Sequence, residues 1–80
     1  MSRLTLNNVC QDVVLQSTMS AHDIAKMLKK PYSTLMREIN PYDPGAKLGA
    51  ETLLEIMRHT GNTTPLEYMA EQLGLKVVPK

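Results

Sequence analysis

Apolar side chains recur along this chain in five short runs, and polar residues, glycines or prolines separate the runs. Each run has the three- and four-residue spacing of one buried helix face. The pattern predicts an all-α fold of five short helices in one domain, residues 1–80. The expected helices cover about residues 7–18, 20–30, 31–40, 50–60 and 64–74.

The first run predicts a helix that supports the next two. Asn7 or Asn8 can cap its start, and its apolar positions are Val9, Cys10, Val13 and Val14. The three β-branched valines lower the helix propensity. A strand is therefore the alternative for this stretch.

The second run begins with a strong helix-start pattern. Ser20 can cap the free N–H groups, Asp23 can reach back to it, and Met19 can pack on Ile24. The sequence Lys29-Lys30-Pro31 ends this helix, because helical backbone is disfavoured just before proline, and Pro31 suits the start of another. The expected buried positions are Ile24, Ala25 and Leu28.

The third run gives a short helix with two different faces. Tyr32, Leu35, Met36 and Ile39 share the apolar face, while Ser33, Arg37 and Asn40 line the opposite one. A small helix with a polar, arginine-bearing face suits the major groove of DNA. Residues 20–40 are therefore predicted to form a DNA-binding helix-turn-helix core of the lambda-repressor-like type.

This hypothesis assigns a role to each polar residue of the pair. The candidates for contacts with base edges are Ser33, Thr34 and Arg37, since arginine can bind guanine with two hydrogen bonds. Candidates for contacts with the DNA backbone are Lys26, Lys29, Lys30, Tyr32 and Lys47. Tyr32 can instead be half-buried, and the core is the expectation for its side chain. Glu38 can read a cytosine amino group, pair with a lysine or arginine, or face solvent, and solvent is the expectation.

The remainder of the chain predicts a loop, two helices and a tail. Two prolines and a glycine place residues 40–49 in an ordered loop. Gly61 and Gly74 suit helix ends, and Thr64 to Glu67 matches a capping box. The expected inward positions are Ala50, Leu53, Leu54 and Met57 in the fourth helix, and Leu66, Met69, Ala70 and Leu73 in the fifth. The apolar tail, residues 75–80, either packs on its own core or joins a second copy.

Charge is distributed unevenly along the chain, although the net charge is only +1. Residues 26–47 carry five cationic side chains against two carboxylates, and residues 48–75 carry one against four. The positive charge thus coincides with the predicted helix-turn-helix, as expected for a protein that binds double-stranded DNA.

Other classes of function find little support in the sequence. Cys10, His22 and His59 lie on three different elements without zinc-ligand spacing, so we expect no enzyme, metal or cofactor. No signal peptide and no apolar run of membrane-spanning length is present, which predicts a cytoplasmic protein without a membrane partner.

The chain resembles the phage regulatory protein CII family, the small lysogeny regulators of P2-type temperate phages and prophages. The resemblance extends from Ile24 to Pro79 and rests on the motifs TLMREINP, AKLGAETLLEIM, TGNTTPLEYMAEQLG and LKVVP. It implies a transcription regulator that binds DNA as a homo-oligomer, a dimer or tetramer, in the bacterial host, with RNA polymerase as a further partner. It also implies a DNA-reading role for Ser33, Thr34 and Arg37. The chain departs from generic helix-turn-helix units at Lys29, where those units favour glycine.

Two alternative functions remain open at this point. The helical pair can be a protein-interaction module in which the tail and the acidic helices bind a partner. It can also be an architectural protein that bends DNA, as phage excision proteins do. Salt-sensitive binding to duplex DNA distinguishes the first alternative from the leading hypothesis.

Overall fold

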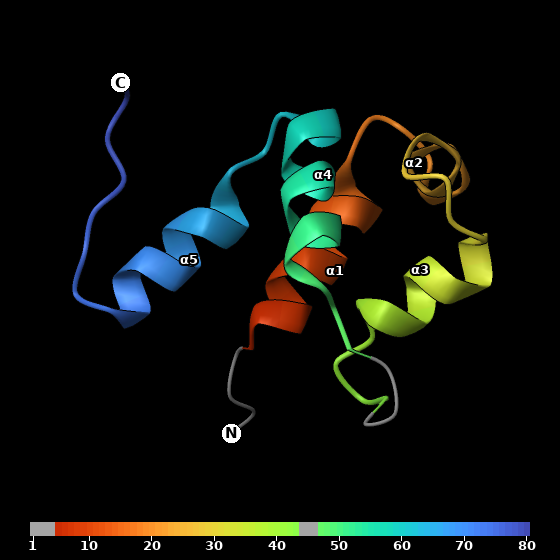
Figure 1. Ribbon diagram of the computed structural model, residues 1–80, viewed down its shortest axis with the longest axis horizontal. Helices are drawn as coiled ribbons and strands as arrows, with labels where there is room; N and C mark the ends of the chain where they lie inside the picture. The colour runs from red at the N-terminus through yellow and green to blue at the C-terminus, as the bar shows by residue number, and fades with distance from the viewer. Residues whose placement is uncertain (1–4, 44–46) are drawn as a thin grey trace.

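The computed structural model describes residues 5–43 and 47–80, and within these residues the fold is all-α (Figure 1). Helices α1 and α4 lie at the centre, the pair α2 and α3 packs on one side, and α5 packs on the other (Figure 1). The helices are α1 Leu6–Gln16, α2 Ala21–Met27, α3 Tyr32–Glu38, α4 Ala50–Thr60 and α5 Thr64–Gln72. The prediction of five helices is confirmed.

The first run forms a helix as predicted, α1, but the helix starts at a different residue. Thr5, rather than Asn7 or Asn8, is the N-cap: its hydroxyl accepts from the Asn8 backbone N–H at 3.2 Å, and the Asn8 side chain accepts from the Thr5 N–H at 2.9 Å. Asn8 therefore takes part as the third helical residue of a capping box. The helix ends before Thr18 because Ser17 has extended backbone, and its hydroxyl accepts from the Met19 N–H.

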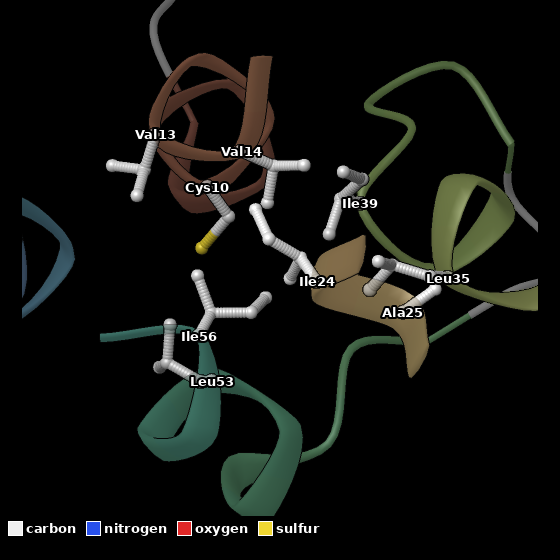
Figure 2. Close-up of a cluster of buried hydrophobic side chains, with 9 residues drawn as sticks. All are labelled: Cys10, Val13, Val14, Ile24, Ala25, Leu35, Ile39, Leu53 and Ile56. Atoms are coloured by element: carbon white, nitrogen blue, oxygen red, sulfur yellow. The ribbon is translucent and has the colours of Figure 1, made fainter. Parts of the chain in front are cut away.

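One buried cluster joins the first four helices. Ile24, Leu35, Ile39 and Ile56 are fully buried at its centre (Figure 2). The four residues predicted for the face of α1 all lie in the core, which confirms that stripe. The other members of the cluster are Cys10, Val13, Val14, Ala25 and Leu53.

The predicted inward face of α4 was wrong in part. Leu53 is buried as expected, but Ala50 and Leu54 are exposed, and Thr52 and Ile56 are buried instead. Residues 53, 56, 57 and 60 form a second stripe with the same helical spacing as residues 50, 53, 54 and 57, so periodicity alone cannot choose between them. Packing against α1 and α2 selects the stripe that contains Ile56.

The predicted face of α5 is less buried than expected. Met69 and Ala70 are half-buried, whereas Leu66 and Leu73 are 40% and 73% exposed. The capping box at Thr64 also does not form: the side chain of Asn62 accepts from both the backbone N–H and the hydroxyl of Thr64. Thr63 takes the N-cap position instead.

Both predicted helix stops are confirmed. Gly61 follows α4 with φ 69° and Gly74 follows α5 with φ 71°, backbone conformations that side chains with a Cβ disfavour. After Gly74 the tail residues Leu75, Val77 and Val78 are exposed, so the tail does not pack on its own core.

We predict that core truncation at Ile24 strongly destabilises the fold. Ile24→Ala leaves a cavity between helices and should lower the free energy of unfolding by about 2–5 kcal/mol. Leu15→Ala, at a 57% exposed position of α1, is the control and should change it by less than about 0.5 kcal/mol. Urea denaturation followed by circular dichroism measures both, and equal effects would contradict the placement of the core.

Candidate nucleic-acid interface

The helix pair α2–α3 is joined by a turn whose geometry is set at Lys29. Ser20 caps α2, its hydroxyl accepting from the Asp23 N–H at 3.1 Å as predicted. At the other end Lys29 has φ 58°, the left-handed conformation that glycine favours. The Lys29 N–H donates to Lys26 O and the Lys30 N–H to Ala25 O, which is the Schellman arrangement of a helix end. Generic helix-turn-helix units favour glycine at this position. Lys29 is thus the residue whose backbone requires a positive φ.

Pro31 lies one position earlier than its predicted place as the first helical residue. It is the N-cap of α3, with φ −60° and ψ 142°, and its carbonyl accepts from the Leu35 N–H. The two helices with this turn are compatible with the predicted helix-turn-helix.

The inner face of α3 is anchored by two side chains. Leu35 and Ile39 are fully buried and point toward Ile24 and Ala25 of the core (Figure 2). Burying these two side chains fixes the rotation of α3 about its own axis. The opposite face of the helix is therefore held toward solvent.

Two aromatic rings link the first turns of α2 and α3. His22 and Tyr32 are stacked, with ring centroids 3.7 Å apart and planes 2° from parallel. Tyr32 is 39% exposed, so it does not belong to the core, contrary to the interpretation that placed it there. The stack adds a contact between the helices outside the apolar cluster.

The three candidates for base contacts all lie on α3. Ser33 and Arg37 are exposed and one helical turn apart, and Thr34 is half-buried beside them. Asn40 is half-buried beyond the helix, and its side chain accepts from the Tyr42 N–H. The outer face of α3 consequently presents one hydroxyl and one guanidinium group to solvent.

Arg37 is held by a carboxylate from the loop that follows α3. Its Nε lies 3.1 Å from Asp43 Oδ2, and the side chains are 64% and 23% exposed. The pair orients the guanidinium, while the N–H groups of its terminal nitrogens can still donate. Sequence reasoning did not find this partner, because the two residues are six positions apart and only Arg37 is helical.

The predicted backbone-contact lysines divide into two groups. Lys26, Lys29 and Lys47 are exposed, and Lys47 lies shortly before the start of α4. Lys30, in the turn before α3, instead has its Nζ 3.2 Å from Oε2 of Glu38, the last residue of α3. The Lys30 ammonium is therefore already partly neutralised within the helix pair.

Glu38 does not face solvent as expected. Its side chain is 18% exposed and pairs with Lys30, and its backbone carbonyl accepts from the Asn7 side chain of α1 at 3.1 Å. Glu38 Oε1 is buried and has no hydrogen-bond partner among the described residues. Glu38 thus serves the placement of α3 rather than the outer surface.

Neither a metal site nor a reactive thiol accompanies this helix pair. In residues 5–43 and 47–80, no group of three histidine, cysteine or acidic side chains could hold a metal ion. Cys10 lies in the core, where desolvation raises the pKa of its thiol to about 11. The thiol consequently stays protonated at neutral pH. The described helices also include none with the length and apolar character that a bilayer crossing requires.

Comparison with known proteins identifies the family. The family model for phage regulatory protein CII (CP76) matches residues 4–80. The chain belongs to this family. The match covers all five helices and the tail, so the whole described fold belongs to a phage regulatory protein. No curated protein and no solved structure shows a significant match.

We predict that glycine at position 29 stabilises this CII-family protein. Lys29→Gly relieves the left-handed strain and should raise the free energy of unfolding by up to about 1 kcal/mol. Lys26→Gly removes the same charge from within α2 and should lower it by about 1 kcal/mol. Thermal unfolding of the two variants compares them, and a loss of stability in Lys29→Gly would contradict the strain at the turn.

Proposed function

We propose that this phage regulator binds double-stranded DNA sequence-specifically through the outer face of α3. It then controls transcription from lysogenic promoters in the cytoplasm of its bacterial host. The observation that carries the proposal is the exposed pair Ser33 and Arg37 on a short helix whose other face is anchored by Leu35 and Ile39. Membership of a family of phage regulatory proteins supports it.

Arg37 is the residue to which we assign the strongest base contact. The major-groove edge of guanine has two acceptors, N7 and O6, and a guanidinium can donate to both. Asp43, by binding Nε, limits the orientations of the guanidinium before DNA arrives. An oriented side chain loses less conformational entropy on binding. Ser33 and Thr34 supply hydroxyls for neighbouring bases.

The positive charge around the pair would supply the contacts to phosphate groups. Lys26 and Lys29 lie at the end of α2 and Lys47 in the connection to α4, all exposed. Such contacts raise affinity for any duplex and make it fall with salt. Lys30 contributes less to this attraction in our proposal, because Glu38 is already beside it. Tyr32 can donate its hydroxyl to a phosphate while its ring remains stacked on His22.

Binding DNA in the proposed way requires no catalytic residue, no metal and no cofactor. Control of a promoter would bring the bound protein close to RNA polymerase, which we propose as its further partner. The architectural alternative predicts a strong bend in the bound DNA, which circular-permutation gel shifts measure.

The first test is selection of bound fragments from random and phage or host genomic DNA, followed by fluorescence anisotropy on the selected site. Arg37→Ala should lower specific affinity by about 1–3 kcal/mol. Arg58→Ala is a matched control: it also removes an exposed arginine 3.1 Å from a carboxylate, with 62% against 64% side-chain exposure, but on α4. It should leave specific affinity nearly unchanged.

Two results would count against the proposal. Recovery of no enriched fragment even at low salt would remove the DNA-binding function. Equal losses in Arg37→Ala and Arg58→Ala would leave DNA binding in place and reject α3 as the reading face.

We further predict opposite effects of Asp43→Asn on specific and non-specific DNA. The substitution removes a negative charge near the DNA, so affinity for unrelated duplexes should rise slightly. It also loosens Arg37, so affinity for the specific site should fall. The ratio of specific to non-specific affinity should therefore drop about tenfold. Glu55→Gln, which removes the carboxylate beside Arg58, is the control. An unchanged ratio in Asp43→Asn would show that the ion pair has no part in base recognition.

A further inference from the structure

A hollow of about 290 Å³ lies between α1 and the connection that leads from α4 to α5. Its volume is close to the lower end of the range of about 300–1,000 Å³ that small-molecule sites have. None of the described residues that line it belongs to α2 or α3, so it is separate from the candidate nucleic-acid interface. The lining residues are Val9, Asp12, Val13, Gln16, Asn62 and Thr64.

Helix α1 gives the hollow one wall, which is partly apolar and partly polar. Its four lining residues are spaced by three and four positions, so they share one face of the helix. Val9 and Val13 are 6% and 4% exposed, whereas Asp12 and Gln16 are exposed. A ligand in the hollow therefore meets methyl groups on its buried side and a carboxylate and an amide on its solvent side.

The other wall is the connection between α4 and α5, and its side chains are held in place. Oδ1 of Asn62 accepts from the backbone N–H of Thr64 at 3.0 Å and also from the Thr64 hydroxyl. The Asn62 amide is thereby fixed, while the Thr64 oxygen keeps its lone pairs for a further donor. This wall is preorganised, which lowers the entropy cost of binding a ligand.

Asp12 supplies the charge of the hollow. Among residues 5–43 and 47–80 its carboxylate has no ion-pair or hydrogen-bond partner, and no other charged residue of these ranges lines the hollow. A metal ion would need further carboxylate or imidazole ligands, and no such group of side chains exists in the described part of the chain. The unpaired carboxylate therefore favours an organic cation.

A guanidinium group on an aliphatic stem matches both walls. The stem can cover the methyl groups of the two valines, and the planar head can donate two N–H groups to the Asp12 carboxylate. Its remaining N–H groups can donate to the side-chain carbonyl of Gln16 and to the Thr64 hydroxyl. An ammonium group is more strongly hydrated, so it loses more when it is partly removed from water.

We infer that this hollow is a binding site for an alkylguanidinium group. Two sources supply this chemistry, a free small molecule and an arginine side chain of another protein, and the test below distinguishes them. The inference does not rest on the DNA-binding proposal, because the site shares no residue with α2 or α3.

A ¹H–¹⁵N NMR titration of the whole chain without DNA tests the site. Agmatine, a guanidinium on a butylamine stem, represents the free molecule, and Nα-acetylarginine methylamide represents the side chain of a protein. At least one of them should shift the amide signals of residues 9–16 and 62–64, with a dissociation constant on the order of 1 mM for so small a ligand. Tighter binding of agmatine assigns the site to a free molecule, and tighter binding of the arginine derivative assigns it to a partner protein.

Matched compounds and variants test the charge. Asp12→Asn should raise the dissociation constant about three- to fivefold, because the pair it removes is exposed to solvent. Glu51→Gln removes another exposed carboxylate, in the first turn of α4, and should leave the constant unchanged. Nα-acetylcitrulline methylamide, in which a neutral urea replaces the guanidinium, should bind more weakly than the arginine derivative. Putrescine, in which an ammonium replaces it, should bind more weakly than agmatine.

Either of two results overturns the inference. The first is that neither guanidinium compound shifts these signals at about 10 mM, ten times the expected constant. The second is that Asp12→Asn binds as tightly as the wild type, or that Glu51→Gln weakens binding as much as Asp12→Asn does. Circular dichroism checks that both variants fold, which their exposed positions lead us to expect.

Discussion

The packing of Leu35 and Ile39 on the core is the constraint on which the candidate interface depends. Helix α3 has only seven residues, too few to be stable alone, and it packs mainly on α2. Its two buried side chains fix both its position and its rotation (Figure 2). Because Ile24 of α2 is fully buried among α1, α3 and α4, a disturbance of the core also displaces the outer face of α3. Stability and the proposed recognition of DNA are coupled through this contact.

Two ion pairs involve neighbouring residues at the end of α3, and their roles differ. Lys30 and Glu38 join the turn to the end of α3, and the backbone of Glu38 is also bonded to Asn7 of α1. Arg37 and Asp43 join the outer face of α3 to the following loop. The first pair is largely shielded from water and holds the helix in place. The second is more exposed, so it contributes little to stability, and its main effect is on the orientation of one guanidinium.

The two ends of the molecule present different side chains to solvent. The pair α2–α3 presents hydroxyl and cationic groups, whereas α5 and the tail present aliphatic groups with balanced charge. Helices α1 and α4 separate them (Figure 1). A short helix reads few bases, so specific binding by such a small helix commonly requires two copies on a two-fold site.

Membership of the CII family and most of the helix boundaries could be predicted from the sequence, because both depend on short, contiguous patterns. Ser20, Gly61 and Gly74 act on backbone groups within a few residues of themselves, so their effects follow from the local sequence. The stripe of α1 was predictable for a similar reason, since only one apolar face is available there. The family motifs are likewise linear.

The tertiary structure alone decided which of two apolar stripes of α4 is buried and how much of α5 stays uncovered. In both helices the spacing permits burial, and only the neighbouring helices determine where it occurs. The partners of Arg37, Lys30 and Glu38 also required the folded chain, since they lie six, eight and 31 residues away, respectively, where helical periodicity gives no information. Local hydrogen bonding thus determined the helices, and long-range packing determined which surfaces they leave for function.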